Sequence, residues 1–225
     1  MQSSAQKTGN LYRIVSFDRA AEIITGKKLY FASPSSWDDP FERALKNSAA
    51  QAIFAQCWCR KAVSDAMWRI YSPHCLGVRI ATTRQRLQQA IVAAGNTRKL
   101  SYSILDVDYL KQEELTRRLE TIRQEFKKQF SPPTAMNPLF MKRLAFDHER
   151  ETRAVILDED SLTGEPKKGI SIPVDPFKLI TSIWIDPRAP DEVVKAYKFY
   201  LKEKLEFPGK VERSGLYAVP EGLAA

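Results

Sequence analysis

The residues of this sequence most suited to chemistry lie in the segment HERETR, residues 148–153. Glu149, Glu151 and Arg153 alternate with a spacing of two, and the segment leads into the apolar run AVIL. Residues two apart in a β-strand project from the same face. We therefore expect these three side chains on one face of a strand over residues 149–157. Two carboxylates held close together could accept a hydrogen bond from a sugar hydroxyl and stabilise positive charge on a ribosyl carbon. The alternative is a solvated strand edge.

A second polar group surrounds the end of the strand predicted for KLYFAS. Tyr30 lies within this strand, and Ser33 ends it directly before the loop PSSWDDPFE. An aromatic ring and a hydroxyl beside a packed loop would suit the face of a flat ring and its ribose. Pro, Ser and Asp make the loop irregular, while Trp37 and Phe41 indicate that it packs down. Alternatively, Asp38 caps its own turn through backbone N–H groups.

Two further candidates lie on the strand LYRIV and on the short helix SDAMWRIY. Arg13 stands in the middle of the otherwise apolar strand. Its planar guanidinium could hold a carboxylate or a phosphate in a cleft, or it could point outward from an edge strand. On the helix, which Ser64 can cap, Trp68 and Tyr71 are candidate contacts for a bound cofactor. The alternative is that both pack in the core.

The elements that must position these residues predict an α+β fold. Strands and helices do not alternate strictly, and the first turn is not glycine-rich, which argues against a doubly wound parallel sheet. We expect a mixed, mostly antiparallel sheet flanked by helices, in a single domain over residues 11–225 after a flexible segment at residues 1–10. Strands are predicted at residues 11–15, 28–33, 53–59, 76–81, 99–105, 149–157 and 182–186.

The longest predicted helix covers residues 110–130. Its apolar residues recur at helical spacing on one face, which is typical of a face packed on a core rather than of a cofactor site. The segment SPPTAMNP ends this helix. The apolar stripe consists of Leu115, Leu119, Ile122, Phe126 and Phe130.

The positive net charge of the sequence favours an anionic partner. The 225 residues include 35 Lys and Arg against 27 Asp and Glu, a formal net charge of +8. Such an excess suits nucleic acid, a phosphorylated small molecule or an acidic protein. Much of the charge is interleaved, as in the pair Glu113 and Arg117, four residues apart on a predicted helix. This pattern is typical of a solvated surface.

The cysteines and the lack of long apolar runs predict the cellular compartment of the protein. Cys57, Cys59 and Cys75 are odd in number and lack the spacing of a disulfide framework or a zinc site. No run approaches the ~20 apolar residues of a membrane span, and the first ten residues lack the apolar core of a signal peptide. We therefore expect a cytoplasmic protein without a membrane partner.

Four blocks of the sequence, in order, resemble a known family. They are LYR, LYFASPSSWDDPFE, MWRIYSPHCLG and ERETR, and they look like the bacterial domain-of-unknown-function family 2971 over roughly residues 11–200. Asp38 stands where that family usually has Asn, and Phe146 stands where it commonly has Trp. The family itself implies no activity.

A looser resemblance, to ADP-ribosyltransferases, implies a chemistry. Those enzymes have a first-strand Arg or His that holds NAD, a second strand with Tyr or Ser beside the nicotinamide, and a late strand with a catalytic Glu. Arg13, then Tyr30 or Ser33, then Glu149 or Glu151 occur here in that order. The resemblance implies an enzyme that uses NAD as substrate on an unknown acceptor, such as a toxin or defence effector. Glu151 is the preferred catalytic residue because it lies deeper in the predicted strand.

Two other functions remain open. The chain could be a non-enzymatic module that binds nucleic acid or another protein through its basic surface, with Arg13, Trp37 and Trp68 gripping the partner. It could also be a magnesium-dependent nuclease, with Asp38, Asp39, Glu149 and Glu151 as metal ligands.

Overall fold

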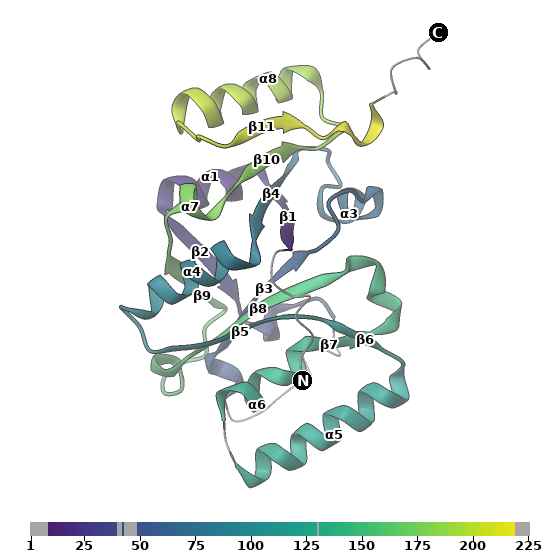
Figure 1. The fold of residues 1–225 in the computed structure, drawn as a ribbon, viewed down its shortest axis with the longest axis vertical. Helices are drawn as coiled ribbons and strands as arrows, with labels where there is room; N and C mark the ends of the chain where they lie inside the picture. The colour runs from purple at the N-terminus through teal and green to yellow at the C-terminus, as the bar shows by residue number, and fades with distance from the viewer. Residues whose placement is uncertain (1–8, 40–41, 43–48, 130, 219–225) are drawn as a thin grey trace. The chain divides into compact units, whose positions relative to one another are not determined.

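The protein has an α+β fold in which most strand pairs are antiparallel (Figure 1). The computed structural model describes residues 9–39, 42, 49–129 and 131–218. The predicted fold class, a mixed and mostly antiparallel sheet with helices, is confirmed. The predicted flexible segment at residues 1–10 lies, up to residue 8, outside the described residues. Within the described ranges, no helix is both long and apolar enough to cross a membrane.

The chain divides into two compact units, each made of several segments. The first comprises Met1–Lys28, Lys61–Arg86 and Asp175–Ala225, and the second comprises Leu29–Arg60 and Leu87–Val174. The single domain expected over residues 11–225 stays a prediction.

The first unit contains four strands in the order β11–β10–β4–β1. β1 and β4 are antiparallel over their full lengths, β4 and β10 are antiparallel, and β10 and β11 are parallel. Ser64 caps the short helix α3 as expected, because its hydroxyl accepts a hydrogen bond from the backbone N–H of Met67. The elements are β1 (Asn10–Ser16), α1 (Phe17–Gly26), α3 (Asp65–Tyr71), β4 (Gly77–Thr83), α7 (Pro176–Leu179), β10 (Ser182–Ile185), α8 (Asp191–Phe199) with a π-helical turn (Tyr200–Lys204), and β11 (Lys210–Arg213).

The second unit contains strands in the order β5–β8–β3–β2–β9, with a separate parallel pair, β6 and β7. β8 pairs antiparallel with β3 on one side and with β5 on the other, so it is a central strand of this unit. The elements are β2 (Lys28–Ala32), β3 (Ile53–Cys59), α4 (Arg84–Gly95, mostly in this unit), β5 (Leu100–Asp106), β6 (Asp108–Leu110), α5 (Gln112–Lys128), α6 (Pro132–Met136), β7 (Met141–Arg143), β8 (Glu151–Asp158) and β9 (Gly169–Pro173).

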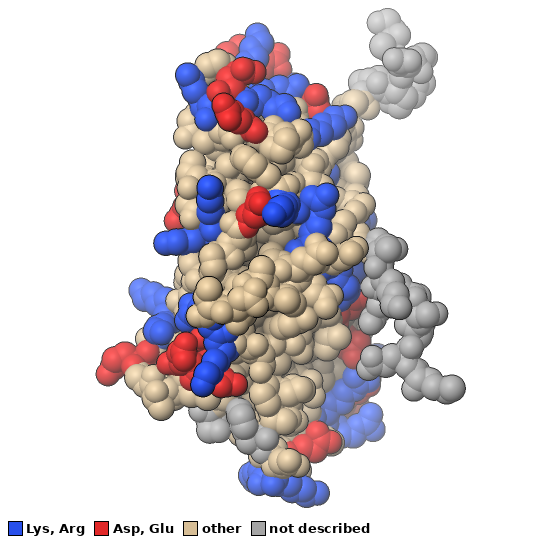
Figure 2. Space-filling model, turned by 60° about the vertical axis from the view of Figure 1, so that its left-hand side comes forward, with Lys and Arg blue, Asp and Glu red and all other residues tan. Residues whose placement is uncertain are grey.

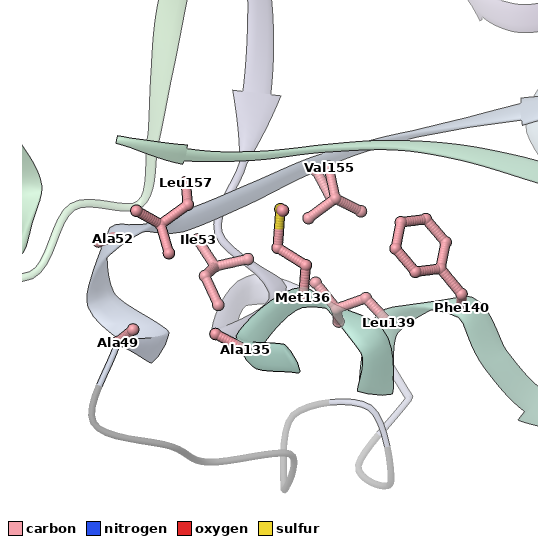
Figure 3. Close-up of a cluster of buried hydrophobic side chains, with 10 residues drawn as sticks. Ala49, Ala52, Ile53, Ala135, Met136, Leu139, Phe140, Val155 and Leu157 are labelled. Carbon is pink, nitrogen blue, oxygen red and sulfur yellow. The ribbon is translucent and has the colours of Figure 1, made fainter. Parts of the chain in front are cut away.

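Helices α5 and α6 cover apolar surfaces of the second unit. Residues two apart on β3 and β8 give one sheet face its apolar side chains, and Figure 3 shows Met136 and Leu139 directed toward Ile53 and Val155. The predicted stripe on α5 packs on apolar side chains: Leu115 is buried with residues of β6 and β7, Leu119 and Ile122 are partly buried beside it, and Phe126 is partly buried against the cluster of Figure 3. Phe130 lies outside the described residues. Buried apolar area of this kind supplies most of the stability of such a unit.

Candidate functional site

The face of β8 changes from apolar to ionic along the strand. Val155 and Leu157 face the apolar cluster, whereas Arg153 and Glu151 continue the same face toward the start of the strand. Every residue of β8 is buried. The solvated strand edge considered for this segment is therefore wrong, and the charges of Glu151 and Arg153 must be neutralised by groups inside the protein.

The start of β8 differs from the prediction. The strand begins at Glu151, while Glu149 ends a 3₁₀-helix, Leu144–Glu149. Arg150 between them has a φ of 46°, in the left-handed region that residues other than glycine rarely adopt. Glu149 therefore does not alternate with Glu151 on a strand. A turn brings the two carboxylates together instead.

Two cations hold the carboxylate of Glu151. The ammonium of Lys142, on β7, lies 2.9 Å from Oε1, and Nε of Arg153 lies 2.5 Å from Oε2. The backbone N–H of Glu151 donates to the hydroxyl of Tyr109, on β6, over 2.8 Å. Each carboxylate oxygen thus has its own charged donor, which is the strong form of hydrogen bond.

Each of these cations also binds a second carboxylate. Lys142 Nζ lies 2.5 Å from Oε2 of Glu149, and Arg153 Nη2 lies 2.5 Å from Oε1 of Glu42. Lys142 Nζ is also 4.0 Å from Oε2 of Glu42. All five side chains are buried. We call this group, Glu42, Lys142, Glu149, Glu151 and Arg153, the glutamate network.

Loop residues cover the glutamate network. The guanidinium of Arg153 lies 4.7 Å from the ring centroid of Trp37, and its Nη1 donates to the carbonyl of Leu139 over 2.9 Å. Asp39 forms an ion pair of 2.9 Å with Arg143. The prediction that Trp37 packs its loop down is confirmed, whereas Phe41 lies outside the described residues. The loop and the HERETR segment therefore meet at one site.

The charge balance of the network explains how it titrates. Three carboxylates face two cations, so the fully ionised network carries one excess negative charge. Burial, followed by the hydrogen bond with Glu151, raises the pKa of Glu149 to about 7. Burial alone would raise the pKa of Glu151, but the charge of Arg153 and the hydrogen bonds from Glu149 and Arg153 hold it well below its usual range. The proton near neutral pH therefore resides on Glu149.

Tyr30 and Ser33 lie in the same unit as the glutamate network. Ala32 pairs with Ala55 on β3, so Tyr30, two residues earlier, shares the sheet face of Ala55. The hydroxyl of Tyr30 donates to the carbonyl of Lys168 over 2.9 Å. Ser33 is buried, and its backbone N–H donates to the same carbonyl over 2.8 Å. The two residues are thus held together at the start of β9.

The remaining predicted residues lie in the first unit. Arg13 pairs with Ile80 across β1 and β4 and is half-buried. Trp68 is only 1% exposed, and its carbonyl accepts a hydrogen bond from Arg188. Tyr71, on the same helix, is exposed. A common site for Arg13, Trp68 or Tyr71 with the glutamate network stays a prediction.

Lys142 is a member of the glutamate network that the sequence did not single out. It stands in the segment FMKRL, whose short β7 strand has too few residues for a clear alternation. Glu42 was visible in the loop sequence, but nothing there indicated its partner Arg153. The basic pair Lys142 and Arg143 between the apolar residues Met141 and Leu144, in a chain with an unexplained Glu-x-Glu pair, was the signal available for Lys142.

The magnesium alternative does not fit this geometry. In the described part of the chain, no group of three or more His, Cys, Asp or Glu residues is arranged to hold a metal ion. The ammonium of Lys142 occupies the point at which Glu149 and Glu151 converge. Asp39 is instead paired with Arg143.

Comparison with known proteins supports the predicted family resemblance. Residues 67–154 match the model of a family described as "Protein of unknown function (DUF2971)", a range that includes Lys142 and the Glu149 to Arg153 segment. The sequence resemblance to that family is confirmed over this range. No curated protein matches the chain.

Solved structures of DarT from Thermus sp. 2.9 are similar to this chain. The complex with NAD+ is 15% identical, with a TM-score of 0.43, over 96% of this chain and 100% of DarT. The complex with ADP-ribosylated single-stranded DNA is 12% identical, with a TM-score of 0.43, over 95% and 98%. The complex with carba-NAD+ is 13% identical, with a TM-score of 0.41, over 95% and 97%.

Proposed function

We propose that this chain is an NAD-dependent ADP-ribosyltransferase-like enzyme in which Glu151 is the catalytic carboxylate. The observation that carries the proposal is the glutamate network. It holds the Glu151 carboxylate between Lys142 and Arg153, and it contains one carboxylate more than it has cations. A fixed, ionised carboxylate in a buried network is suited to stabilise positive charge that develops during a reaction.

Transfer of ADP-ribose from NAD develops charge of that kind. The bond between the ribosyl C1′ and the nicotinamide nitrogen breaks, and its electron pair stays on the nitrogen, which becomes neutral. Positive charge then spreads over C1′ and the ring oxygen. A lone pair of the acceptor forms the new bond to C1′, and the acceptor gives up its proton. A carboxylate near the ribose lowers the barrier because it attracts the transition state more strongly than the substrate.

The other predicted residues receive roles in binding NAD as the substrate. Tyr30 and Ser33 would lie against the nicotinamide and its ribose, and Arg13 would hold the pyrophosphate through its guanidinium. Tyr71 is exposed and would offer a ring surface, while buried Trp68 would act by supporting it. A phosphorylated small molecule other than NAD would use the same contacts of Arg13.

The acceptor is a separate part of the proposal. The net charge of +8 favours an anionic acceptor, and nucleic acid is the candidate class. Figure 2 shows Lys and Arg beside Asp and Glu on the face in view, not a continuous basic surface. A bacterial toxin or defence effector is the role that the family resemblances suggest.

Nicotinamide release tests the proposal against the alternative of a non-enzymatic binding module. Wild-type protein would be incubated with NAD, alone and with single-stranded DNA, RNA or a protein mixture. The proposal expects released nicotinamide and acceptor carrying ADP-ribose, detected by mass spectrometry. Salt-dependent retention on nucleic acid without nicotinamide release under any of these conditions would support the binding module instead.

A further inference from the structure

The glutamate network contains a lysine to which neither family resemblance assigns a role. Lys142 is 6% exposed and binds Glu149 and Glu151 at 2.5 and 2.9 Å. Its ammonium also lies 4.7 Å from the ring centroid of Phe146. Burying an ammonium costs free energy unless its charge is matched. A lysine serving only as general surface charge would not be placed here.

We propose that Lys142 is a positioning residue, which holds the Glu151 carboxylate in place and divides its positive charge between Glu151 and Glu149. The inference rests on the proposed function, because it assumes that Glu151 is the catalytic carboxylate. Lys142 acts through Glu151, and no contact of Lys142 with NAD is required.

Because Lys142 lies between two carboxylates, the share of its charge that compensates Glu151 depends on whether Glu149 is protonated. When Glu149 is ionised, two carboxylates share one ammonium, so the negative charge of Glu151 is compensated less completely. When Glu149 is protonated, Lys142 neutralises Glu151 alone, and the Glu149 carboxyl can donate a hydrogen bond to Glu151. A less negative Glu151 stabilises a cationic transition state less well. Catalysis should therefore rise with pH as Glu149 loses its proton.

The surroundings of Glu149 supply no other cation as close as Lys142 in the described chain. Burial raises the pKa of Glu149 to about 7, with Lys142 acting in the opposite direction. Tyr109 on β6 lies near enough to feel the charges of both glutamates, and burial raises its pKa above its usual range. The charged and titratable groups around Glu149 include Asp147, His148 and Arg150 in its own segment and, from other segments, Lys142, Tyr109, Glu151, Arg153, Glu42 and, opposite Glu151 in register, Cys59.

The test measures the pH profile of nicotinamide release for three lysine variants. In Lys142→Met the midpoint should move to higher pH by about 1 unit or more, because an opposite charge at this range lowers a carboxyl pKa by ~1–3 units. Turnover at neutral pH should fall about 10- to 100-fold, because loss of the contact that holds the Glu151 carboxylate in place outweighs the gain in its uncompensated charge, and the KM for NAD should change less than about threefold. Lys142→Arg should restore the midpoint. Lys128→Met, on the exposed end of α5, is the control and should match wild type.

A double variant keeps the proposal testable if Lys142→Met proves less stable than wild type. Lys142→Met removes one of two cations, so it leaves two excess negative charges in the network. The double variant Lys142→Met/Glu149→Gln restores the balance of the fully ionised wild-type network, one excess charge. Above the pH at which Glu149 ionises in Lys142→Met, the double variant should unfold at a higher temperature than Lys142→Met. An unchanged pH midpoint in a folded Lys142→Met protein, or an equal melting temperature for the single and double variants above that pH, would overturn the proposal.

A measurement without catalysis separates this inference from the proposed function. Isotope-edited NMR of labelled glutamate carboxyls follows the titration of Glu149 in wild type and in Lys142→Met. A midpoint that moves upward in the variant supports the division of charge even if no nicotinamide is released, and only the proposed function then fails. A midpoint that stays in place overturns the role of Lys142 whether or not the protein is an enzyme.

Discussion

Replacing Glu149 by glutamine should remove a specific pH dependence from the stability of the protein. Glu149 is 6% exposed and loses most of its contact with water on folding. Its pKa rises from 4.5 to about 7 in the folded protein. The folded state therefore keeps a proton that the unfolded state has already lost over that pH range. The contribution of this proton to the free energy of unfolding is fully present below about pH 4.5 and is lost as pH rises through about 7.

The size of the stability difference between wild type and the variant follows from the pKa shift of Glu149. Each pKa unit corresponds to about 1.4 kcal/mol, so the full shift corresponds to roughly 3 kcal/mol. The glutamine side chain of the Glu149→Gln variant resembles the protonated carboxyl and carries no titratable proton. The variant should match wild type near pH 5 within about 1 kcal/mol, and it should be more stable than wild type by about 2–3 kcal/mol at about pH 8.

Urea denaturation at half-unit steps between about pH 5 and about pH 8 measures this difference. The control is Glu113→Gln, which removes an exposed carboxylate from α5 and should leave a constant offset. Parallel stability curves for Glu149→Gln and wild type would refute the reasoning about a buried network with excess negative charge.

Three further predictions concern other parts of the molecule. Arg13→Ala should abolish the heat of NAD binding in calorimetry, because it removes the proposed pyrophosphate contact; unchanged heat would rule out that role. Arg153→Met should destabilise the protein by about 3–5 kcal/mol in urea, since it removes a cation that pairs with both Glu42 and Glu151 inside the protein; a loss below about 1 kcal/mol would contradict this. Gly169→Ala should lower stability by about 1–3 kcal/mol, because the added Cβ would overlap the Tyr30 hydroxyl and the backbone of β2. A thermal unfolding curve equal to wild type would show that this contact is absent.

Local sequence patterns predicted much of the fold. The apolar stripe of α5 repeats at helical spacing, and Leu115 and Ile122 pack as that spacing requires. Ser64 caps α3 through a hydrogen bond to a residue three positions away, which the sequence also indicates. Both features depend on neighbours in the chain, so one segment suffices to predict them.

The candidate site was less predictable because its contacts join distant segments. Glu149 and Glu151 were identified as a pair, but the left-handed Arg150 between them replaces the expected strand with a turn. The link between Glu42 and Arg153 joins segments that lie far apart in the sequence. Lys142 lies on a three-residue strand paired with β6, and a strand of that length leaves no periodic signal.

The most direct test of the central claim is the effect of Glu151→Gln on NAD affinity and nicotinamide release, measured on the same preparation. Glutamine keeps the shape of the side chain and removes its negative charge. We predict an NAD affinity close to wild type and nicotinamide release lowered by ~100-fold, the size typical of losing one electrostatic contributor. Glu113→Gln should match wild type in both. Undiminished release by a folded Glu151→Gln protein, or equal losses of affinity and release, would contradict the claim that this carboxylate carries the chemistry.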